Sequence, residues 1–389
     1  MLYSFAGGSD GAQPQAAVVD VNGTFYGTTK AGGTNGSLCP TGCGTAFSFS
    51  GSTEHILHRF SGADGLAPQA PLTKIGTLLY GTTWWGGGTS NAGTVFSISL
   101  SGTVNVLHAF NGTDGLHSLA AVINAKPLAR RTVYGTASGQ YINPGTAFAL
   151  IVSGGQQGRF AVLHTFTGAP DGYGPSSPLV QLNGQLYGTT INGGYSNSKY
   201  GSTPHCRFYY GGTCGTLFSL TNSGQEHVKW EFGIPNYNGS QDGAGPSGQL
   251  AVLGGVLYGT TGQGGDVSHY WPFGAGTVFS YNPYGFSQPE TVLHRFDPNS
   301  GDGAFPNGGL IVRNGNFYGT THSGGTYGYG TVFEITPSGT ETILHSFGFP
   351  SSGDGEGPNG SLLFVRGVFY GTTDSGGTQG LGTIFAVRP

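Results

Sequence analysis

Charged side chains are scarce in this sequence. Lys and Arg total 14 and Asp and Glu total 18 among 389 residues, or 8% against a usual figure of about 25%. The cations are scattered and form no basic stripe of the kind that nucleic acid requires. No apolar run approaches the roughly 20 residues of a transmembrane helix. We therefore expect neither a nucleic-acid partner nor membrane insertion.

Cysteine is also rare, and its four copies fall into two local pairs, Cys39 with Cys43 and Cys206 with Cys214. A structural zinc site would need four Cys or His ligands at a recognised spacing. These two pairs lie in loops of distant parts of the chain. Two local disulfides are therefore favoured over a metal, and no metal site or cofactor is assigned. Disulfides form in oxidising compartments, so we expect a secreted, extracellular protein.

Glycine and aromatic residues are abundant. The chain contains 76 Gly, and 13% of its residues are aromatic, whereas Gly averages roughly 7% in proteins. This composition indicates many tight turns between apolar strands and little charged helix surface. The sequence therefore predicts an all-β fold.

Four short signatures each occur seven times. Tyr-Gly-Thr begins at Tyr26, Tyr80, Tyr134, Tyr187, Tyr258, Tyr318 and Tyr370. Gly-Thr-x-Phe ends at Phe47, Phe96, Phe148, Phe218, Phe279, Phe333 and Phe385. Leu-His-x-Phe or a relative ends at Phe5, Phe60, Phe110, Phe166, Phe232, Phe296 and Phe347, and an Asp-Gly pair follows each copy. Successive Tyr-Gly-Thr copies are 52 to 71 residues apart, and four of the six spacings are 52 to 54. Repeats of about 50 residues are typical of propellers and solenoids.

One repeat shows what each signature contributes. Residues 310–313, 316–321, 330–335 and 341–347 read as four strands, and the first two flank an Asn-Gly pair typical of a two-residue hairpin turn. Four short antiparallel strands joined by tight turns match a propeller blade. We predict a seven-bladed β-propeller that occupies residues 1–389 as one domain.

The ends of the chain favour a closed ring. The sequence opens with a lone fourth strand at 2–5 and finishes after a third strand at 382–387. Pairing these two strands would complete the last blade and remove an open sheet edge. We therefore expect the N-terminal strand to close the ring.

The four signatures, together with a Gly-Gly pair, read in chain order Leu-His-x-Phe, Asp-Gly-x-x-Pro, Tyr-Gly-Thr-Thr, Gly-Gly and Gly-Thr-Val-Phe. This unit resembles the GloVer-type tandem repeat family of secreted bacterial proteins, and the resemblance covers the whole chain. It implies an extracellular propeller and no particular activity. The departures are local: 228–232 replaces the Leu-His motif, and Ala137 replaces the second Thr in blade 3.

Residues present in every blade are expected to hold the blades together. The Asp of each Asp-Gly pair suits a turn that bonds nearby backbone amides. Five His share one strand position, which favours a structural hydrogen bond over catalysis: His58, His108, His164, His294 and His345.

The position after Tyr-Gly-Thr-Thr differs between blades and is expected near the central funnel. Lys30, Trp84, His322 and Asp374 occupy it in blades 1, 2, 6 and 7, which are consecutive in a closed ring. They would form a polar arc with an aromatic floor, to which we add Trp85, as a ligand-binding surface. Four unrelated surface residues are the alternative.

Long loops in blades 4 and 5 form a second candidate surface on the same face. They carry His205, Arg207, Tyr209, His269, Tyr270 and Trp271. Aromatic faces beside polar groups suit sugars, although such loops also pack on each other. His205, Arg207, Tyr209 and His322 would supply the base and cation of a polysaccharide lyase.

The sequence contains no hydrolase elbow, phosphate loop or zinc-protease motif, and its acids belong largely to the repeat. We therefore expect a monomeric, extracellular protein that binds a polysaccharide or glycan. Whether it is an enzyme stays open, and a lyase is favoured over a glycoside hydrolase. The alternative is a non-catalytic surface or assembly module that mediates protein contacts.

Overall fold

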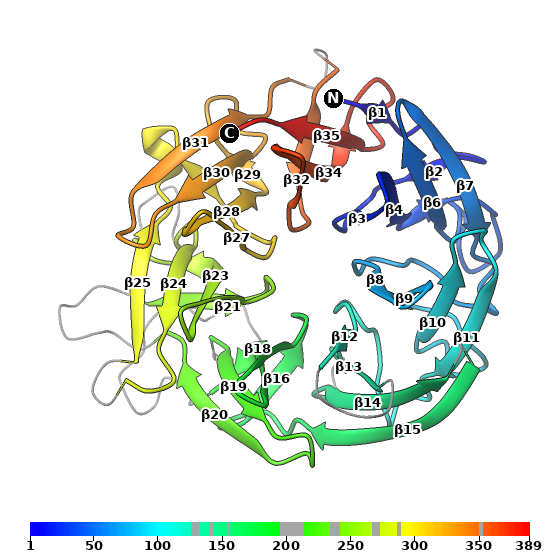
Figure 1. Cartoon of the computed structure of the whole chain (residues 1–389), viewed down its shortest axis with the longest axis horizontal. Coiled ribbons are helices and arrows are strands. Elements are labelled where there is room, and N and C mark those ends of the chain that lie inside the picture. Colours follow the sequence, from blue (N-terminus) through cyan, green and yellow to red (C-terminus); the bar gives the residue numbers. More distant parts are fainter. Residues whose placement is uncertain are drawn as a thin grey trace.

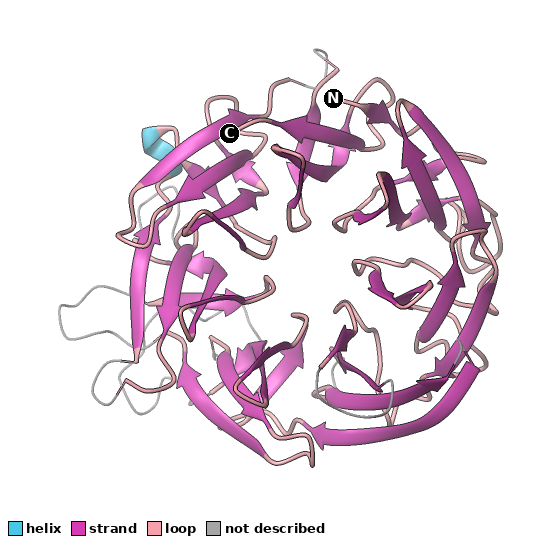
Figure 2. Cartoon of the chain, viewed as in Figure 1, coloured by secondary structure: helices cyan, strands magenta, loops and turns pink. Residues whose placement is uncertain are grey.

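The computed structural model is a ring of seven antiparallel sheets, each forming one blade (Figure 1). It describes residues 1–125, 132–139, 143–153, 156–194, 214–233, 242–266, 273–285, 289–349 and 353–389. Almost all regular structure is strand, and the helix in the described part is the 3-10 turn Pro298–Ser300 (Figure 2). The predicted all-β, seven-bladed propeller is confirmed. None of the described residues lies in a helix that is long and apolar enough to cross a membrane.

The first three blades follow one another clockwise in Figure 1, from dark blue to green. Blade 1 contains β3 (Val19–Val21), β4 (Thr24–Thr29), β6 (Thr45–Ser50) and β7 (Thr53–Arg59), with the small ladder β2 (Gly11–Ala12) and β5 (Ala31–Gly32). Blade 2 contains β8 (Thr73–Ile75), β9 (Leu78–Thr83), β10 (Thr94–Ser99) and β11 (Val104–Ala109). Blade 3 contains β12 (Ile123–Asn124), β13 (Thr132–Ala137), β14 (Thr146–Ser153) and β15 (Gln156–Thr165).

The other four blades complete the ring. Blade 4 contains β16 (Gly172–Pro175), β17 (Val180–Leu182), β18 (Gln185–Gly193), β19 (Thr216–Leu220) and β20 (Glu226–Glu231). Blade 5 contains β21 (Gly243–Pro246), β22 (Ala251–Leu253), β23 (Val256–Gly264), β24 (Thr277–Tyr281) and β25 (Glu290–Arg295). Blade 6 contains β26 (Gly303–Ala304), β27 (Ile311–Arg313), β28 (Asn316–Thr321), β29 (Ser323–Gly324), β30 (Thr331–Ile335) and β31 (Glu341–Ser346). Blade 7 contains β32 (Gly355–Pro358), β33 (Leu363–Val365), β34 (Val368–Gly376), β35 (Thr383–Val387) and β1 (Tyr3–Ser4).

The core of each blade depends on the Gly of Tyr-Gly-Thr. Gly319 in β28 pairs with Phe333 in β30, and a Cβ atom on Gly319 would lie 2.6 Å from the Phe333 ring. The same Phe position is fully or almost fully buried in all seven blades. Any larger residue would displace a core aromatic ring, because interiors are close-packed. This is why a small residue stands in the middle of an otherwise bulky strand.

The two Thr residues of the Tyr-Gly-Thr-Thr motif make different hydrogen bonds, one within the blade and one to the next blade. The hydroxyl of the second Thr lies 2.8–2.9 Å from the hydroxyl of the Gly-Thr-x-Phe threonine in six blades, as in Thr321 with Thr331. Ala137 removes this pair from blade 3. The hydroxyl of the first Thr donates instead to a backbone carbonyl of the next blade, at 2.9–3.5 Å, in all seven blades.

The ring closes as expected from the ends of the chain. Tyr3 and Ser4 of β1 pair with Ile384 and Thr383 of β35. On the inner side, Thr372 of blade 7 donates to the carbonyl of Ala16, which leads into blade 1, at 2.9 Å. Phe5 is fully buried between the same two blades. The predicted closure by the N-terminal strand is confirmed.

Each repeated Asp accepts a hydrogen bond from a side chain of the outer strand before it. The donor is His in five copies and Tyr3 or Trp230 in the other two, at 2.6–3.1 Å. In most copies the carboxylate also accepts from backbone amides of the adjoining loop, such as Gly348 and Gly355 for Asp354. Burial raises the pKa of Asp354, but the His345 hydrogen bond and these amides outweigh it and hold the pKa at about 2. The structural interpretation of the repeated Asp and His residues is confirmed.

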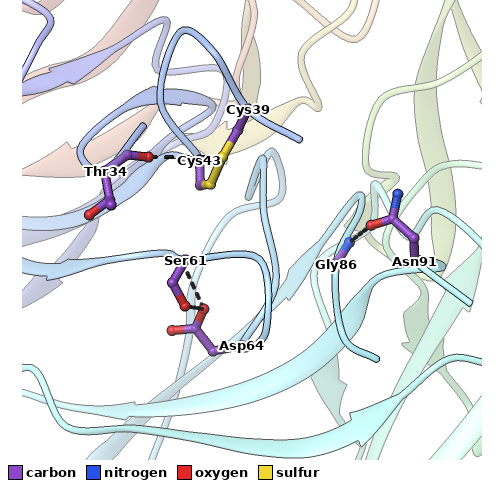
Figure 3. Close-up of a disulfide and its surroundings, with 7 residues drawn as sticks. All are labelled: Thr34, Cys39, Cys43, Ser61, Asp64, Gly86 and Asn91. Atoms are coloured by element: carbon purple, nitrogen blue, oxygen red, sulfur yellow. Dashed lines mark hydrogen bonds between the residues drawn. A yellow bond between two sulfur atoms is a disulfide. The ribbon is translucent and has the colours of Figure 1, made fainter. Parts of the chain in front are cut away.

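The predicted disulfide between Cys39 and Cys43 is present and closes a short loop in blade 1 (Figure 3). The Cys43 amide donates to the Thr34 carbonyl across this loop. Figure 3 also shows two neighbouring loop contacts, Ser61 with Asp64 and the Gly86 amide with Asn91. Cys214 is disulfide-bonded as well, and its predicted partner Cys206 lies outside the described residues.

Deleting residues 1–6 should weaken the ring where blades 1 and 7 meet. The deletion removes β1, the Tyr3–Asp10 hydrogen bond and the buried Phe5 ring. Loss of a buried Phe alone costs about 3–5 kcal/mol. We expect a markedly lower melting temperature or association through the exposed β35 edge, measured by calorimetry and light scattering. Leu2→Ala, at a position 38% exposed, is the control. An unchanged melting temperature in a monomeric deletion variant would contradict the closure.

Glu54 should make stability depend on pH. Burial and the nearby Asp10 carboxylate raise the pKa of Glu54 from 4.5 to about 7, although Arg59 opposes the shift. Folding therefore takes up a proton between these pH values, and the free energy of unfolding falls as pH rises through this window. Glu54→Gln should raise that free energy at pH 8 by on the order of 1 kcal/mol and should leave it unchanged at pH 4. Urea unfolding at both pH values tests this; an equal effect at both would refute it.

Candidate functional site

Seven side chains meet at the axis of the ring, one from each blade. Each is the fifth residue after a repeated Asp and comes shortly before the inner strand of its blade. They are Gln15, Gln69, Leu119, Ser176, Ser247, Asn307 and Asn359, and we call them the axial ring. The axial ring lines a cavity of about 250 Å³. Six of its members carry uncharged polar groups and one is apolar.

The residue after each axial-ring member is small for a local reason. At Gly308 a Cβ atom would lie 2.6 Å from the Gly360 carbonyl oxygen of the next blade. Gly248 meets the Gly308 carbonyl in the same way. The inner strands therefore approach one another through their backbones, which leaves the axial-ring side chains to fill the centre.

A second cavity, of about 340 Å³, forms the mouth of the first on the side of blades 4 to 6. Ser247 and Asn307 line both cavities. Ile191, Gly262 and His322, which follow the Tyr-Gly-Thr-Thr motif in these blades, line the mouth together with Gln263 and Phe305. The mouth is thus bordered by three of the seven variable positions expected near the funnel.

His322 is the titratable group of this mouth. Its Nε2 lies 3.5 Å from Asp374 Oδ2, and Ser375 donates a hydrogen bond to Asp374 Oδ1. Gly357 makes room for the pair, since a Cβ atom there would lie 2.9 Å from His322 Nε2. The Asp374 hydrogen bond and charge outweigh burial and raise the pKa of His322. The imidazole therefore carries positive charge to a higher pH than a free histidine.

Several polar atoms in these cavities have no hydrogen-bond partner. Among the described residues, Ser176 Oγ, Ser247 Oγ and Gln263 Oε1 are buried and unpaired. Buried polar atoms are normally satisfied by protein or by water. These three atoms are exceptions to that rule, although their residues line the cavities.

Trp84 and Trp85 do not stand free beside His322 and Asp374. They pack on His117: Trp84 stacks on the imidazole with ring centroids 4.7 Å apart, and Trp85 meets it edge-on at 3.8 Å. His117 is 1% exposed, and burial lowers its pKa to about 4. The two Trp residues are partly buried against the core between blades 1 and 2. They are thus held as packing partners of a neutral histidine.

The other predicted site residues are not joined to this pair. The Lys30 side chain forms no ion pair or hydrogen bond with any residue that the structure describes, and the predicted four-residue arc reduces to His322 with Asp374. The candidate residues of the long loops, His205, Arg207, Tyr209, His269, Tyr270 and Trp271, lie outside the described residues. The sequence analysis did not identify the axial ring. Its signal is nevertheless present in the repeat, since the fifth residue after the repeated Asp is Gln, Ser or Asn in six of the seven blades.

A separate groove of about 550 Å³ opens between blades 7 and 1, on the face of the short turns. Its walls include Leu2, Phe25, Phe49, Val365, Val368 and Tyr370, with Arg366 and Arg388. Here β1 pairs with β35 at two positions, whereas the outer strand of blade 6 pairs at five. The groove therefore lies beside a short outer strand.

The model of the Gloeobacter/Verrucomicrobia repeat matches residues 1–148, 38–203 and 268–389. The chain belongs to this repeat family. The expected resemblance is thereby confirmed, since the matched segments contain the four signatures in most blades. Among proteins with curated descriptions, none matches the sequence.

Solved structures with a similar fold include enzymes of unrelated sequence. A gluconolactonase from Xanthomonas campestris is 13% identical, with 80% of this chain and 89% of that one covered and a TM-score of 0.42. The α-L-arabinofuranosidase Arb93A from Fusarium graminearum is 11% identical, with coverage of 82% and 91% and a TM-score of 0.47. A subtype N11 neuraminidase-like protein of a bat influenza A virus is 10% identical, with coverage of 88% and 89% and a TM-score of 0.46. At such identities the likeness is one of fold.

Asp374→Asn should lower the pKa of His322, because it removes the carboxylate that stabilises the imidazolium. An NMR titration of the histidine ring protons measures this directly. His117 provides the control within the same spectrum, since its low pKa arises from burial and should not change. An unchanged His322 pKa would mean that the two side chains do not interact in solution.

Proposed function

We propose that this protein is an extracellular carbohydrate-binding propeller that holds a neutral sugar in the axial cavity. The observation that carries the proposal is the axial ring, in which amide and hydroxyl groups from six blades converge on one space. Sugars bind through donors and acceptors of this uncharged kind, arranged around a concave pocket.

The charge of the cavities favours a neutral sugar over an acidic one. Among the described residues, neither cavity is lined by Lys or Arg, and a uronate carboxylate would require a cation for tight binding. Of the described residues that line the mouth, His322 is the one that gains positive charge. The lyase hypothesis depends on His205, Arg207 and Tyr209, which lie outside the described residues, and it stays a prediction.

The disulfide chemistry supports the proposed extracellular location. Cys39 and Cys43 are linked, and Cys214 is linked as well. Such bonds persist in oxidising compartments and are rare in the cytosol. A sugar-binding role is consistent with this environment, where polysaccharides are exposed to the protein.

Protein contact is the second candidate function, and the groove on the short-turn face favours it. Apolar side chains and two Arg residues line that groove beside the unpaired part of β35. Main-chain groups at an open edge accept an added strand. A Val368→Asp variant distinguishes this candidate, because it should weaken protein association without touching the axial cavity.

A glycan array followed by binding measurements tests the proposed function. The parent chain should bind a neutral oligosaccharide, and Ser247→Ala or Asn307→Leu should weaken that binding about tenfold, as expected for a lost buried hydrogen bond. Leu119 already occupies the axial ring, so a Leu at 307 is a matched substitution. Ser338→Ala, in an exposed turn of blade 6, should bind as the parent does. The proposal would be refuted if the parent chain binds no neutral glycan, or if Ser247→Ala and Asn307→Leu both bind as tightly as the parent.

A further inference from the structure

The outer strands of successive blades meet at the rim of the disc, where the end of one lies beside the start of the next (Figure 1). The residue four positions before the repeated His or Trp stands at this meeting point. It is Glu in four blades, at Glu54, Glu226, Glu290 and Glu341, and Phe160 in blade 3. Phe160 stacks on His108 of the preceding blade, with ring centroids 3.6 Å apart. The four Glu residues lie at the equivalent position, beside the outer strand of the preceding blade.

Two of these meeting points combine a histidine with two carboxylates. His294 at the end of β25 lies 2.9 Å from Asp302 and 3.9 Å from Glu341 at the start of β31, measured from Nε2 to the nearest carboxylate oxygen. His164, Asp171 and Glu226 form the equivalent set between blades 3 and 4, and His164 lies 3.1 Å from Asp171. In each set the three ligand atoms lie within 4.8 Å of one another.

Both sets are largely withdrawn from solvent, and Lys229 is a positive charge near Glu226 in one of them. The side chains of His294, Asp302 and Glu341 are 18%, 9% and 12% exposed. Glu341 Oε1 and Glu226 Oε1 are buried with no hydrogen-bond partner in the described part of the chain. Two carboxylates held this way against one imidazole need a cation or a shared proton, because uncompensated buried charge is strongly destabilising.

We propose that each set binds one divalent transition-metal ion, of which Zn²⁺ is the example, and that the ion links two neighbouring blades. One imidazole nitrogen and two carboxylate oxygens are ligands that zinc accepts, with water completing the coordination. Zinc bonds of about 2.0–2.2 Å at tetrahedral angles place ligand atoms roughly 3.3 Å apart. The observed separations of 2.9 and 3.9 Å lie on either side of this value. The His Nε2 proton must then leave or move to Nδ1.

The meeting point between the two sets provides an internal control. There Trp230 replaces His and donates its indole N–H to Asp242 at 2.7 Å, while Glu290 takes the place of Glu341. An indole N–H is a donor and cannot be a metal ligand, and Arg295 supplies positive charge nearby. This carboxylate pair should not bind zinc. The ligands of each set come from separate repeats, so no linear metal motif marks them in the sequence.

The test uses the full chain after treatment with EDTA and dialysis, titrated with ZnCl₂ by calorimetry and counted by native mass spectrometry. Glu341→Gln and Glu226→Gln should each lose one bound zinc ion, and the double variant should lose two relative to the parent. Glu290→Gln should lose none. Zinc should raise the melting temperature of the parent and not that of the double variant. CaCl₂ is the comparison ion, since calcium requires more oxygen ligands than these sets supply.

The proposal is overturned if the parent binds no zinc below millimolar concentration, or if the double variant binds as many ions as the parent. Circular dichroism of each metal-free variant checks that the fold is intact. A second pair, His294→Gln and His164→Gln, repeats the count with the nitrogen ligand removed. If these variants also retain both ions, the zinc is bound elsewhere and the two sets are held by a shared proton.

Discussion

One hydrogen bond, repeated at every blade interface, determines how this ring is built. The first Thr of each Tyr-Gly-Thr-Thr motif donates to a backbone carbonyl of the next blade, and the bond from Thr372 to Ala16 returns the series to its start. Each hydroxyl is buried, so its loss would leave a polar group unpaired at the inner end of two blades. Two of the acceptor carbonyls belong to Gly308 and Gly360, where the next inner strand leaves no room for a larger side chain. The interior of the ring is therefore fixed while the surface facing the axis is free to vary.

Residues that vary between blades are the candidates for function, because the residues repeated in the blades are needed for the fold. Gly, Phe, Thr, Asp and His of the repeat are occupied by packing and by hydrogen bonds within or between blades. The axial ring is not occupied in this way, and its side chain is Gln, Leu, Ser or Asn depending on the blade. The rim is intermediate, since its His and Asp residues belong to the repeat and its Glu residues do not. Sugar binding at the axis and metal binding at the rim would thus use the same scaffold without competing for residues.

Local sequence patterns were sufficient to predict the blades, their number, the closing strand and the Cys39–Cys43 disulfide. Each depends on residues close in the chain or on a signature repeated seven times. The site was harder to predict because its members are brought together only by the curvature of the whole ring. Trp84 was expected to form the aromatic floor of a polar arc with Lys30, His322 and Asp374, and it stacks on the buried His117 of the next blade. Asn307 and Ser247 stand at a fixed distance from the repeated Asp, but no local feature shows that their side chains line one cavity.

A crystal structure of the chain with a bound neutral oligosaccharide tests the central claim most directly. If the axial cavity binds sugar, electron density for a sugar ring should appear within it, with hydrogen bonds to Ser247 and Asn307 and the outer end of the sugar beside His322. The repeat residues and the inter-blade Thr hydrogen bonds should be unchanged by the ligand. Sugar density at the rim, or in the groove between blades 7 and 1 with the axial cavity empty, would contradict the account.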